Sequence, residues 1–261
     1  APAGRTRKAP PRAMPAARAL AAMHGLDLAG VAGSGPGGSI TRADVEALIA
    51  PEEGEVLSEQ RRAMARRMAE AGAQVVPATM QDQAAVTAWK DADVLLRLVR
   101  AVAAAAAAEP ALNAWYDSGS RGRRLCTGID IGIAVDTEDG LFVPILRDVE
   151  KRSEADLRKG LEAMKTDVGE RSVPPEELRG ATIAYSNFGT LAGKYASPVI
   201  VPPQVAILGS GVIYEAVVAH EGKPAVRRVM PLSLTFDHRA VTGGEAARFL
   251  AAVIEDLQKQ K

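Results

Sequence analysis

The chain has 261 residues, which is long enough for about one or two domains with a sizeable core. Its 32 basic side chains balance its 32 acidic ones, so no net charge favours nucleic acid or a membrane surface as the main partner. No apolar run approaches the roughly 20 residues that cross a membrane, and nothing resembles a signal peptide. The single cysteine, Cys126, has no partner for an internal disulfide. The composition therefore predicts a cytoplasmic protein whose charged recognition is local.

The N-terminal region predicts a linker followed by a very small helical domain over residues 14–50. Residues 1–13 are rich in Ala, Pro and basic side chains, which is typical of an extended linker. A short helix is expected over residues 14–25, with Pro15 in its first turn and Gly25 as its C-cap. Two short helices in fewer than 50 residues make only a small core.

A glycine-rich loop at residues 33–40 connects the two expected helices of this domain. It could be mistaken for a phosphate cradle, but no strand precedes it and no Lys-Ser or Lys-Thr pair follows it. Thr41 is instead the expected N-cap of a second helix over residues 42–49, in which Leu48 or Ile49 faces inward. The loop is therefore interpreted as structural.

A polar hinge at residues 51–57 separates this domain from a larger unit over residues 58–261. The larger unit opens with a helix in which Met64 and Met68 share one face and four arginines surround the other. After it we expect strands at 75–86, 128–136, 141–146, 181–186, 204–213 and 225–236, and helices at 94–108, 153–168 and 244–257. This mixture of sheet and long helices predicts a two-layer α+β domain.

The most informative segment is the turn between the last strand and the last helix, Asp237-His238-Arg239-Ala240-Val241-Thr242-Gly243-Gly244. A neutral imidazole is the usual side chain for taking a proton near pH 7, so His238 is a candidate general base. Taken alone, a histidine at a strand end is more often a hydrogen-bonded structural residue. Thr242 is equally suited to capping the helix that follows it.

This turn resembles the His-x-x-x-Asp-Gly signature of the dihydrolipoamide acyltransferases, the core subunits of 2-oxoacid dehydrogenase complexes, with Thr242 in place of the Asp. Four further blocks resemble the family in the family's order, namely residues 110–114 around Asn113, 132–144, Ser186-Asn187-Phe188-Gly189, and 202–209. Residues 14–50 resemble the family's peripheral subunit-binding domain, and the stretch between Ala85 and Leu95 is shorter than in most members. The resemblance thus covers both units.

The resemblance implies a chloramphenicol acetyltransferase-like fold and transfer of an acyl group from lipoyl-lysine to coenzyme A. His238 would be the general base, and Ser186 would donate a hydrogen bond to the oxyanion. In the family the two residues come from neighbouring chains of a trimer, which assembles further into a cubic or dodecahedral core. Judged without the resemblance, Ser186 is a plausible turn serine beside Asn187 and Gly189.

The resemblance also implies partners. Arg18 and Arg42 match surface positions that hold the decarboxylase or the dihydrolipoamide dehydrogenase, although a solvated side chain is the alternative for Arg18. Ala19, Ala22 and Ser39 stand where basic residues are common in the family, so we expect weakened partner binding. The lipoyl group would be carried on a domain that is absent from these residues and is expected upstream of Ala1.

Two other functions compete with catalysis. One is a non-catalytic scaffold that docks dihydrolipoamide dehydrogenase, which retention of both His238 and Ser186 disfavours. The other is a free-standing acetyltransferase acting on a small molecule, which the subunit-binding domain disfavours. Serine rather than threonine at position 186 favours an acetyl or branched-chain acyl group over succinyl.

Overall fold

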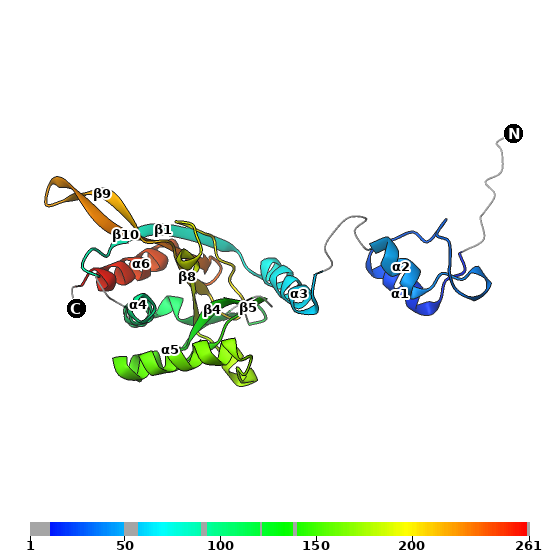
Figure 1. Ribbon diagram of the computed structural model, residues 1–261, viewed down its shortest axis with the longest axis horizontal. Coiled ribbons are helices and arrows are strands. Elements are labelled where there is room, and N and C mark those ends of the chain that lie inside the picture. The colour runs from blue at the N-terminus through cyan, green and yellow to red at the C-terminus, as the bar shows by residue number, and fades with distance from the viewer. Residues whose placement is uncertain (1–10, 50–56, 90–92, 121, 138–139, 260–261) are drawn as a thin grey trace. The chain divides into compact units, whose positions relative to one another are not determined.

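The computed structural model describes residues 11–49, 57–89, 93–120, 122–137 and 140–259. The chain forms two compact units, Ala1–Ser58 and Glu59–Lys261, called unit 1 and unit 2 below (Figure 1). The linkers expected at 1–13 and 51–57 fall almost entirely outside the described residues. In the described part of the chain, no helix combines the length and the apolar character needed to cross a membrane.

Unit 1 contains helix α1 (Pro15–Met23), a single 3-10 turn η1 (Pro36–Gly38) and helix α2 (Arg42–Ile49). Gly25 follows α1 with a φ of 64°, a left-handed conformation that favours glycine at a helix C-terminus. Ile49 packs against the core of the unit, whereas Leu48 is 52% exposed, which decides between the two inward positions expected from the sequence. The buried core consists of Ala17, Ala21, Leu28, Ile40 and Val45.

Asp44 ties the glycine-rich loop of unit 1 to the start of α2. Its carboxylate accepts the backbone amides of Ser34 at 2.9 Å and Thr41 at 2.7 Å. The Ser34 hydroxyl, the Ser34 amide and the Thr41 amide together hold the pKa of Asp44 well below its ordinary range. A Cβ added to Gly33 would lie 2.3 Å from the backbone carbon of Ser39, so the loop is also closely packed. These contacts support the structural interpretation of the loop.

The elements of unit 2 follow one another along the chain in alternating groups of helices and strands. They are α3 (Glu59–Gln74), β1 (Pro77–Ala85), α4 (Val94–Ala108), η2 (Pro110–Leu112), β2 (Ala114–Asp117), β3 (Gly122–Leu125), β4 (Ile131–Thr137), β5 (Gly140–Phe142), β6 (Ile145–Leu146), η3 (Val149–Lys151), α5 (Glu154–Gly169), η4 (Pro175–Leu178), β7 (Ile183–Asn187), η5 (Phe188–Thr190), β8 (Ala206–Ser210), β9 (Tyr214–His220), β10 (Lys223–Asp237) and α6 (Gly243–Gln258).

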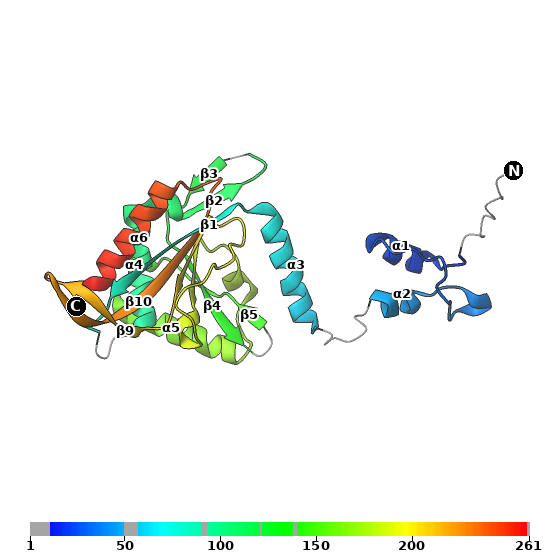
Figure 2. The ribbon, with the colours of Figure 1, turned by 90° about the horizontal axis from the view of Figure 1, so that it is seen from above.

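Eight of these strands form one mixed sheet in the order β1-β10-β8-β7-β4-β5, with β6 paired to β4 and β9 paired to β10 (Figure 2). Strand β7 runs parallel to both β4 and β8, and the other pairs are antiparallel. Strands β2 and β3 make a separate two-stranded hairpin. The predicted two-layer α+β architecture is confirmed.

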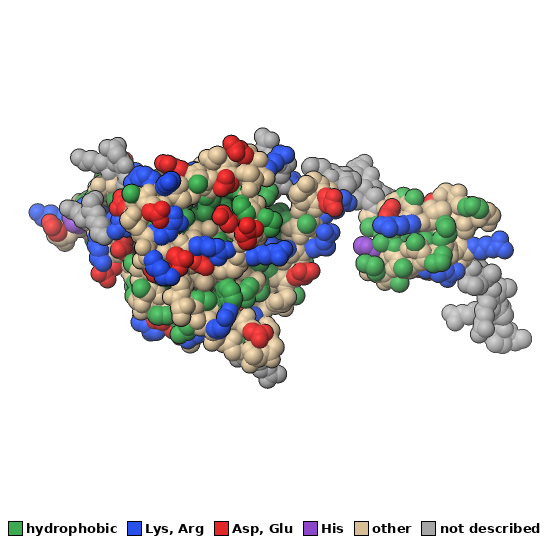
Figure 3. Space-filling view, turned by 90° about the horizontal axis from the view of Figure 1, so that it is seen from below, with side chains coloured by type: hydrophobic (Ala, Val, Ile, Leu, Met, Phe, Trp, Pro, Cys, Tyr) green, Lys and Arg blue, Asp and Glu red, His purple; other side chains and the backbone are tan. Residues whose placement is uncertain are grey.

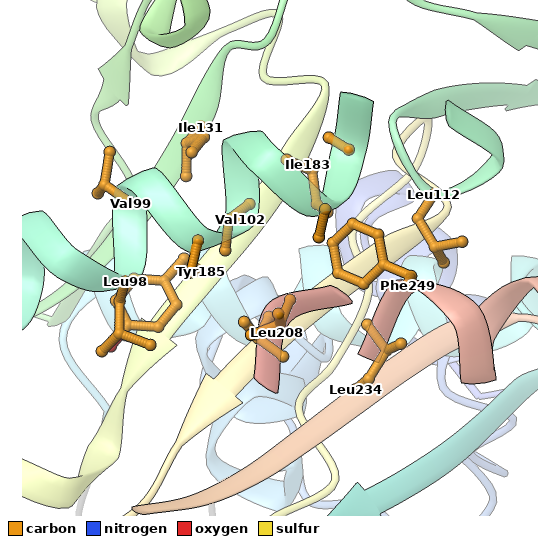
Figure 4. Packing of buried hydrophobic residues seen from close by; sticks show 14 of the residues in the cluster. Leu98, Val99, Val102, Leu112, Ile131, Ile183, Tyr185, Leu208, Leu234 and Phe249 are labelled. Atoms are coloured by element: carbon orange, nitrogen blue, oxygen red, sulfur yellow. The ribbon is translucent and has the colours of Figure 1, made fainter. Parts of the chain in front are cut away.

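The hydrophobic core of unit 2 lies between one face of the sheet and helices α4 and α6. Tyr185, Leu208 and Leu234 stand opposite one another on three neighbouring strands and point to this face. Leu98 of α4 and Phe249 of α6 are fully buried against the same cluster, and Figure 4 shows these side chains pointing toward one another. Since successive side chains along a strand point to opposite faces, the neighbours of these three residues along each strand point away from the core.

The opposite face of the sheet is covered in part by the chain between β7 and β8. Ala184 and Ile207 pack there against Ile200, and the Ser233 hydroxyl accepts the amide of Ala196 at 3.2 Å. On the side of unit 2 seen in Figure 3, basic and acidic side chains are interspersed, with apolar side chains exposed between them.

Two hairpins were not expected from the sequence. In β2–β3 the pattern is short and broken by polar residues, so no period-two signal marks it. In β9 the two valines take an exposed and a half-buried position because the ribbon projects beyond the sheet, and among the described residues β9 pairs with β10 alone. The strand expected over 204–213 therefore ends earlier, at Ser210, and Tyr214 begins a separate one.

Candidate active site

His238 occupies a tight turn between β10 and α6. The amides of Ala240 and Val241 both donate to the Asp237 carbonyl at 2.9 Å, and the His238 amide donates to the Val76 carbonyl at 2.8 Å. The imidazole is exposed and lies 5.5 Å from the Phe236 ring, centroid to centroid. Within the described ranges the ring makes no hydrogen bond of its own, so the backbone of the turn sets its position.

The residues on either side of His238 form a partly buried ion pair. Asp237, which is only 2% exposed, accepts from Arg239 Nη2 at 2.6 Å and from Arg239 Nε at 3.0 Å. These hydrogen bonds raise the pKa of Arg239 above its ordinary value. The Arg239 guanidinium also stacks 4.6 Å above the Tyr116 ring of β2. The pair holds both flanks of His238 in one conformation.

Thr242 caps helix α6. Its hydroxyl accepts the Glu245 amide at 3.3 Å, while the Glu245 carboxylate accepts the Thr242 amide at 2.7 Å, which is a capping box. Burial would raise the pKa of Glu245, but hydrogen bonds from Thr242 and Arg123 outweigh burial and hold the pKa below its ordinary value. The capping role expected as one of two possibilities for Thr242 is thus present in the structure.

Ser186 lies near the end of β7 and is half-buried. The side chains of its neighbours Tyr185 and Asn187 are both hydrogen-bonded to the Ser210 hydroxyl, at 2.6 Å from the Tyr185 hydroxyl and 3.3 Å from the Asn187 side-chain oxygen. Gly189 approaches the backbone so closely that an added Cβ would lie 2.3 Å from Gly211. In the described part of the chain the Ser186 hydroxyl has no hydrogen-bond partner, so it is available to a ligand.

Ser186 and His238 do not meet within one chain. Ser186 stands opposite Gly209, which stands opposite Ser233, and His238 lies five positions beyond Ser233. Five residues at about 3.3 Å and two strand spacings of about 4.8 Å put the α-carbons roughly 19 Å apart. Ser186 also points to the sheet face opposite the one that carries Phe236 and the core helices.

A cavity of about 440 Å³ lies beside the turn. Asp237 and Arg239 line it together with Tyr116, Ser118 and Gln74, but His238 is not among its lining residues. A single chain therefore leaves the imidazole outside the concave surface. Among the described residues, no three His, Cys, Asp or Glu side chains converge as metal ligands would.

Arg18 and Arg42, the expected partner-binding residues, are exposed but both make contacts within unit 1. Arg18 donates to the Pro11 carbonyl at 2.9 Å and the Ala13 carbonyl at 3.1 Å, which secures the chain before α1. Arg42 pairs with Glu46 at 2.8 Å, one helical turn along. A structural contribution of Arg18 is therefore present in addition to any contact with a partner.

The chain matches two known families over nearly its whole length. Residues 50–261 match the 2-oxoacid dehydrogenases acyltransferase catalytic domain, and residues 11–46 match the e3 binding domain. The acetyltransferase component of the acetoin cleaving system of Bacillus subtilis is 34% identical over 92% of this chain and 67% of its own length. The matches with this relative and two others span about two-thirds of the length of each.

Solved structures agree with these matches. The cubic core of a pyruvate dehydrogenase multienzyme complex has a TM-score of 0.74 and 26% identity over 82% of this chain and 94% of its own. The dihydrolipoamide acetyltransferase of Azotobacter vinelandii has a TM-score of 0.73 and 26% identity over the same shares of both chains. That structure is described as a study of a serine, a histidine and an asparagine in its catalytic mechanism.

Proposed function

The chain belongs to the 2-oxoacid dehydrogenase acyltransferase family, with an E3-binding domain before a catalytic domain, and we propose that it transfers an acyl group from S-acyl-dihydrolipoyl-lysine to coenzyme A. The observation that carries the proposal is the exposed His238 imidazole, which a hydrogen-bonded turn presents without a hydrogen-bond partner of its own among the described residues. The donor group would arrive on a lipoyl domain outside these 261 residues.

His238 acts as the general base in this proposal. A thiol with a pKa near 8.5 is mostly protonated at neutral pH, so the imidazole takes its proton as the sulfur attacks the thioester carbonyl. The tetrahedral intermediate then expels the dihydrolipoyl sulfur, which receives the proton from the imidazolium. Such a positioned base contributes on the order of 10² to 10⁴ in rate.

Ser186 donates a hydrogen bond to the oxyanion of the tetrahedral intermediate. A donor of this kind is worth about 3 to 4 kcal/mol of activation free energy. The free hydroxyl of Ser186 supports this role. So does the Azotobacter vinelandii acetyltransferase, whose catalytic mechanism was examined at a serine and a histidine together with an asparagine.

The active site forms between chains of a homotrimer. The separation of roughly 19 Å between Ser186 and His238 within one chain supports this, because a hydrogen bond must span about 3 Å. Unit 2 also exposes large apolar side chains that an adjoining chain would cover, namely Met64, Val76, Leu191, Tyr195, Val199 and Val212. Further assembly into a larger core is proposed from the likeness to a cubic pyruvate dehydrogenase core.

Unit 1 binds dihydrolipoamide dehydrogenase or the decarboxylase, with Arg18 and Arg42 in the contact. The match to the e3 binding domain supports this proposal. Arg18 already donates a hydrogen bond inside unit 1, and Arg42 already forms an ion pair there. We therefore expect each arginine to contribute only weakly to the free energy of partner binding. The cytoplasm is the proposed location. An acetyl or branched-chain acyl group is the proposed cargo, because relatives that match most of the chain include components of both kinds.

A complementation experiment tests the shared site most sharply. His238→Ala and Ser186→Ala each remove one partner, so each variant alone should lose at least about a hundredfold in kcat. Trimers reassembled from equal amounts of the two should regain activity at about one site in four, because one chain supplies the intact histidine and its neighbour the intact serine. No recovery after confirmed subunit exchange would contradict a site built from two chains.

Steady-state assays with acetyl-, isobutyryl- and succinyl-dihydrolipoamide define the acyl group. Thr242→Asp should change kcat by less than about tenfold, because the Thr242 hydroxyl caps helix α6 and takes no part in proton transfer. His238→Ala should therefore lower kcat far more than Thr242→Asp does. Equal losses for Thr242→Asp and His238→Ala would refute this division of roles. Absence of turnover with all three donors would favour the docking scaffold instead.

A further inference from the structure

The β2–β3 hairpin is hydrogen-bonded to the His238 turn through the side chain of Arg123. The Arg123 Nη1 atom donates to the Ala240 carbonyl at 2.7 Å and to the Glu245 carboxylate at 2.9 Å. Its side chain is 28% exposed and that of Glu245 is 17% exposed, so the contact is partly shielded from water. The Arg123 guanidinium thus connects the backbone after His238 with the N-terminal end of helix α6.

Glu245 extends this contact to the helix cap. One carboxylate oxygen accepts from Arg123, and the other accepts from the Thr242 amide and hydroxyl at 2.7 and 3.0 Å. Thr242 carries no charge, so the negative charge next to the turn is supplied by Glu245. The network therefore connects the hairpin with a turn and a helix that lie more than 100 positions later in the sequence.

A second contact joins the same hairpin to the turn at Arg239, the residue next to His238. Arg239 stacks on Tyr116 of β2 and lies 3.5 Å from the Ser118 hydroxyl, while Arg123 of β3 holds Ala240. Because the imidazole itself has no hydrogen-bond partner among the described residues, its direction depends on the backbone that these contacts fix.

We propose that Arg123 is a positioning residue for the His238 turn, acting through the Ala240 carbonyl and the Glu245 carboxylate. The inference rests on the proposed role of His238 as general base. A base must lie within hydrogen-bond reach of the thiol, and a displacement of about 1 Å costs on the order of a hundredfold in rate. Arg123 touches no reacting atom and acts only by keeping the turn in place.

The test compares Arg123→Met, Arg123→Lys and Arg124→Met in the assembled protein. Arg124 is the matched control because it is adjacent on β3 but stacks on Trp115, 4.5 Å from the ring centroid, and makes no hydrogen bond or ion pair with the turn in the described part of the chain. We expect Arg123→Met to lower kcat by about tenfold to a hundredfold, with KM for both substrates unchanged within about twofold. Arg123→Lys should recover part of the loss, because an ammonium can reach one of the two acceptors.

The coupling to Glu245 gives a second measurement. Arg123→Met and Glu245→Gln should have non-additive effects on kcat, since each breaks the same contact. Additive losses, a loss confined to KM, or equal losses in Arg124→Met would each overturn the proposal.

Amide hydrogen exchange separates this inference from the function on which it rests. In Arg123→Met the amides of residues 238–242 should exchange faster than in the wild type and in Arg124→Met. Inactivity of the wild-type protein would refute the proposed acyl transfer, whereas unchanged exchange in Arg123→Met would refute the positioning role.

Discussion

The hydrogen bonds that fix the glycine-rich loop of unit 1 and the His238 turn of unit 2 differ in how far apart their partners lie in the sequence. In unit 1, Asp44 binds Ser34 and Thr41, which lie ten and three positions away, and five side chains make up the buried core. In unit 2, the His238 turn is held by Val76 and Arg123, which lie more than 100 positions away. The small unit therefore depends on local hydrogen bonds, and the catalytic unit depends on contacts that the folded core must bring together.

The largest expected effect is on the core of unit 2. Phe249→Ala removes a fully buried ring between α6 and the sheet and should cost about 3 to 5 kcal/mol of unfolding free energy. Unit 1 should keep its own unfolding transition, because its core shares no residue with this one. Urea unfolding followed by circular dichroism measures the first effect, and methyl NMR signals of Ile40 and Val45 measure the second.

Leu191→Ala is the control for this core substitution, since Leu191 is 75% exposed in the single chain. It should leave the unfolding of a dissociated chain almost unchanged. A loss in Leu191→Ala as large as in Phe249→Ala would contradict the location of the core.

A smaller effect is expected in the loop of unit 1. Gly33→Ala would place a Cβ 2.3 Å from the Ser39 backbone, and overpacking of this kind costs about 1 to 3 kcal/mol. The same NMR signals should show unit 1 unfolding at lower temperature, with acyl transfer to coenzyme A unchanged. Gly72→Ala in α3 of unit 2, where the added Cβ would meet nothing within 4 Å, should leave the melting temperature of unit 1 unchanged. An unchanged melting temperature of unit 1 in Gly33→Ala would contradict close packing at Gly33.

The smallest effect is an acid sensitivity of unit 1. The pKa of Asp44 is lower in the folded protein than the value of about 3.9 in an unfolded chain. Its contribution to stability is therefore complete above pH about 4 and is lost as the pH falls through the folded pKa. As the pH falls from 6 to about 2, the melting temperature of unit 1 should fall less steeply in Asp44→Asn than in the wild type. Parallel curves for the two proteins would show that Asp44 does not cause the acid sensitivity of unit 1.

The helices were the most predictable part of the fold. The structure places α4 at Val94–Ala108, as expected, because its apolar spacing is regular, Asp93 caps its start and Pro110 follows its end. The helix at 42–49 was equally clear from its N-cap. The β2–β3 hairpin was missed because its strands are four residues long and carry no alternation, and its place is set by contacts with the His238 turn.

The amino-acid sequence was sufficient for the two-part organisation, the order of the family's motifs and the candidacy of His238 and Ser186, because motifs and periodicity are local properties of the chain. It could not reveal that these two residues lie roughly 19 Å apart within one chain, since strand order and register determine that distance. Nor could it connect Arg123 with Glu245, because a contact across 122 positions exists only when the core packs β3 beside α6. The residue types were visible from the beginning, and folding determined their partners.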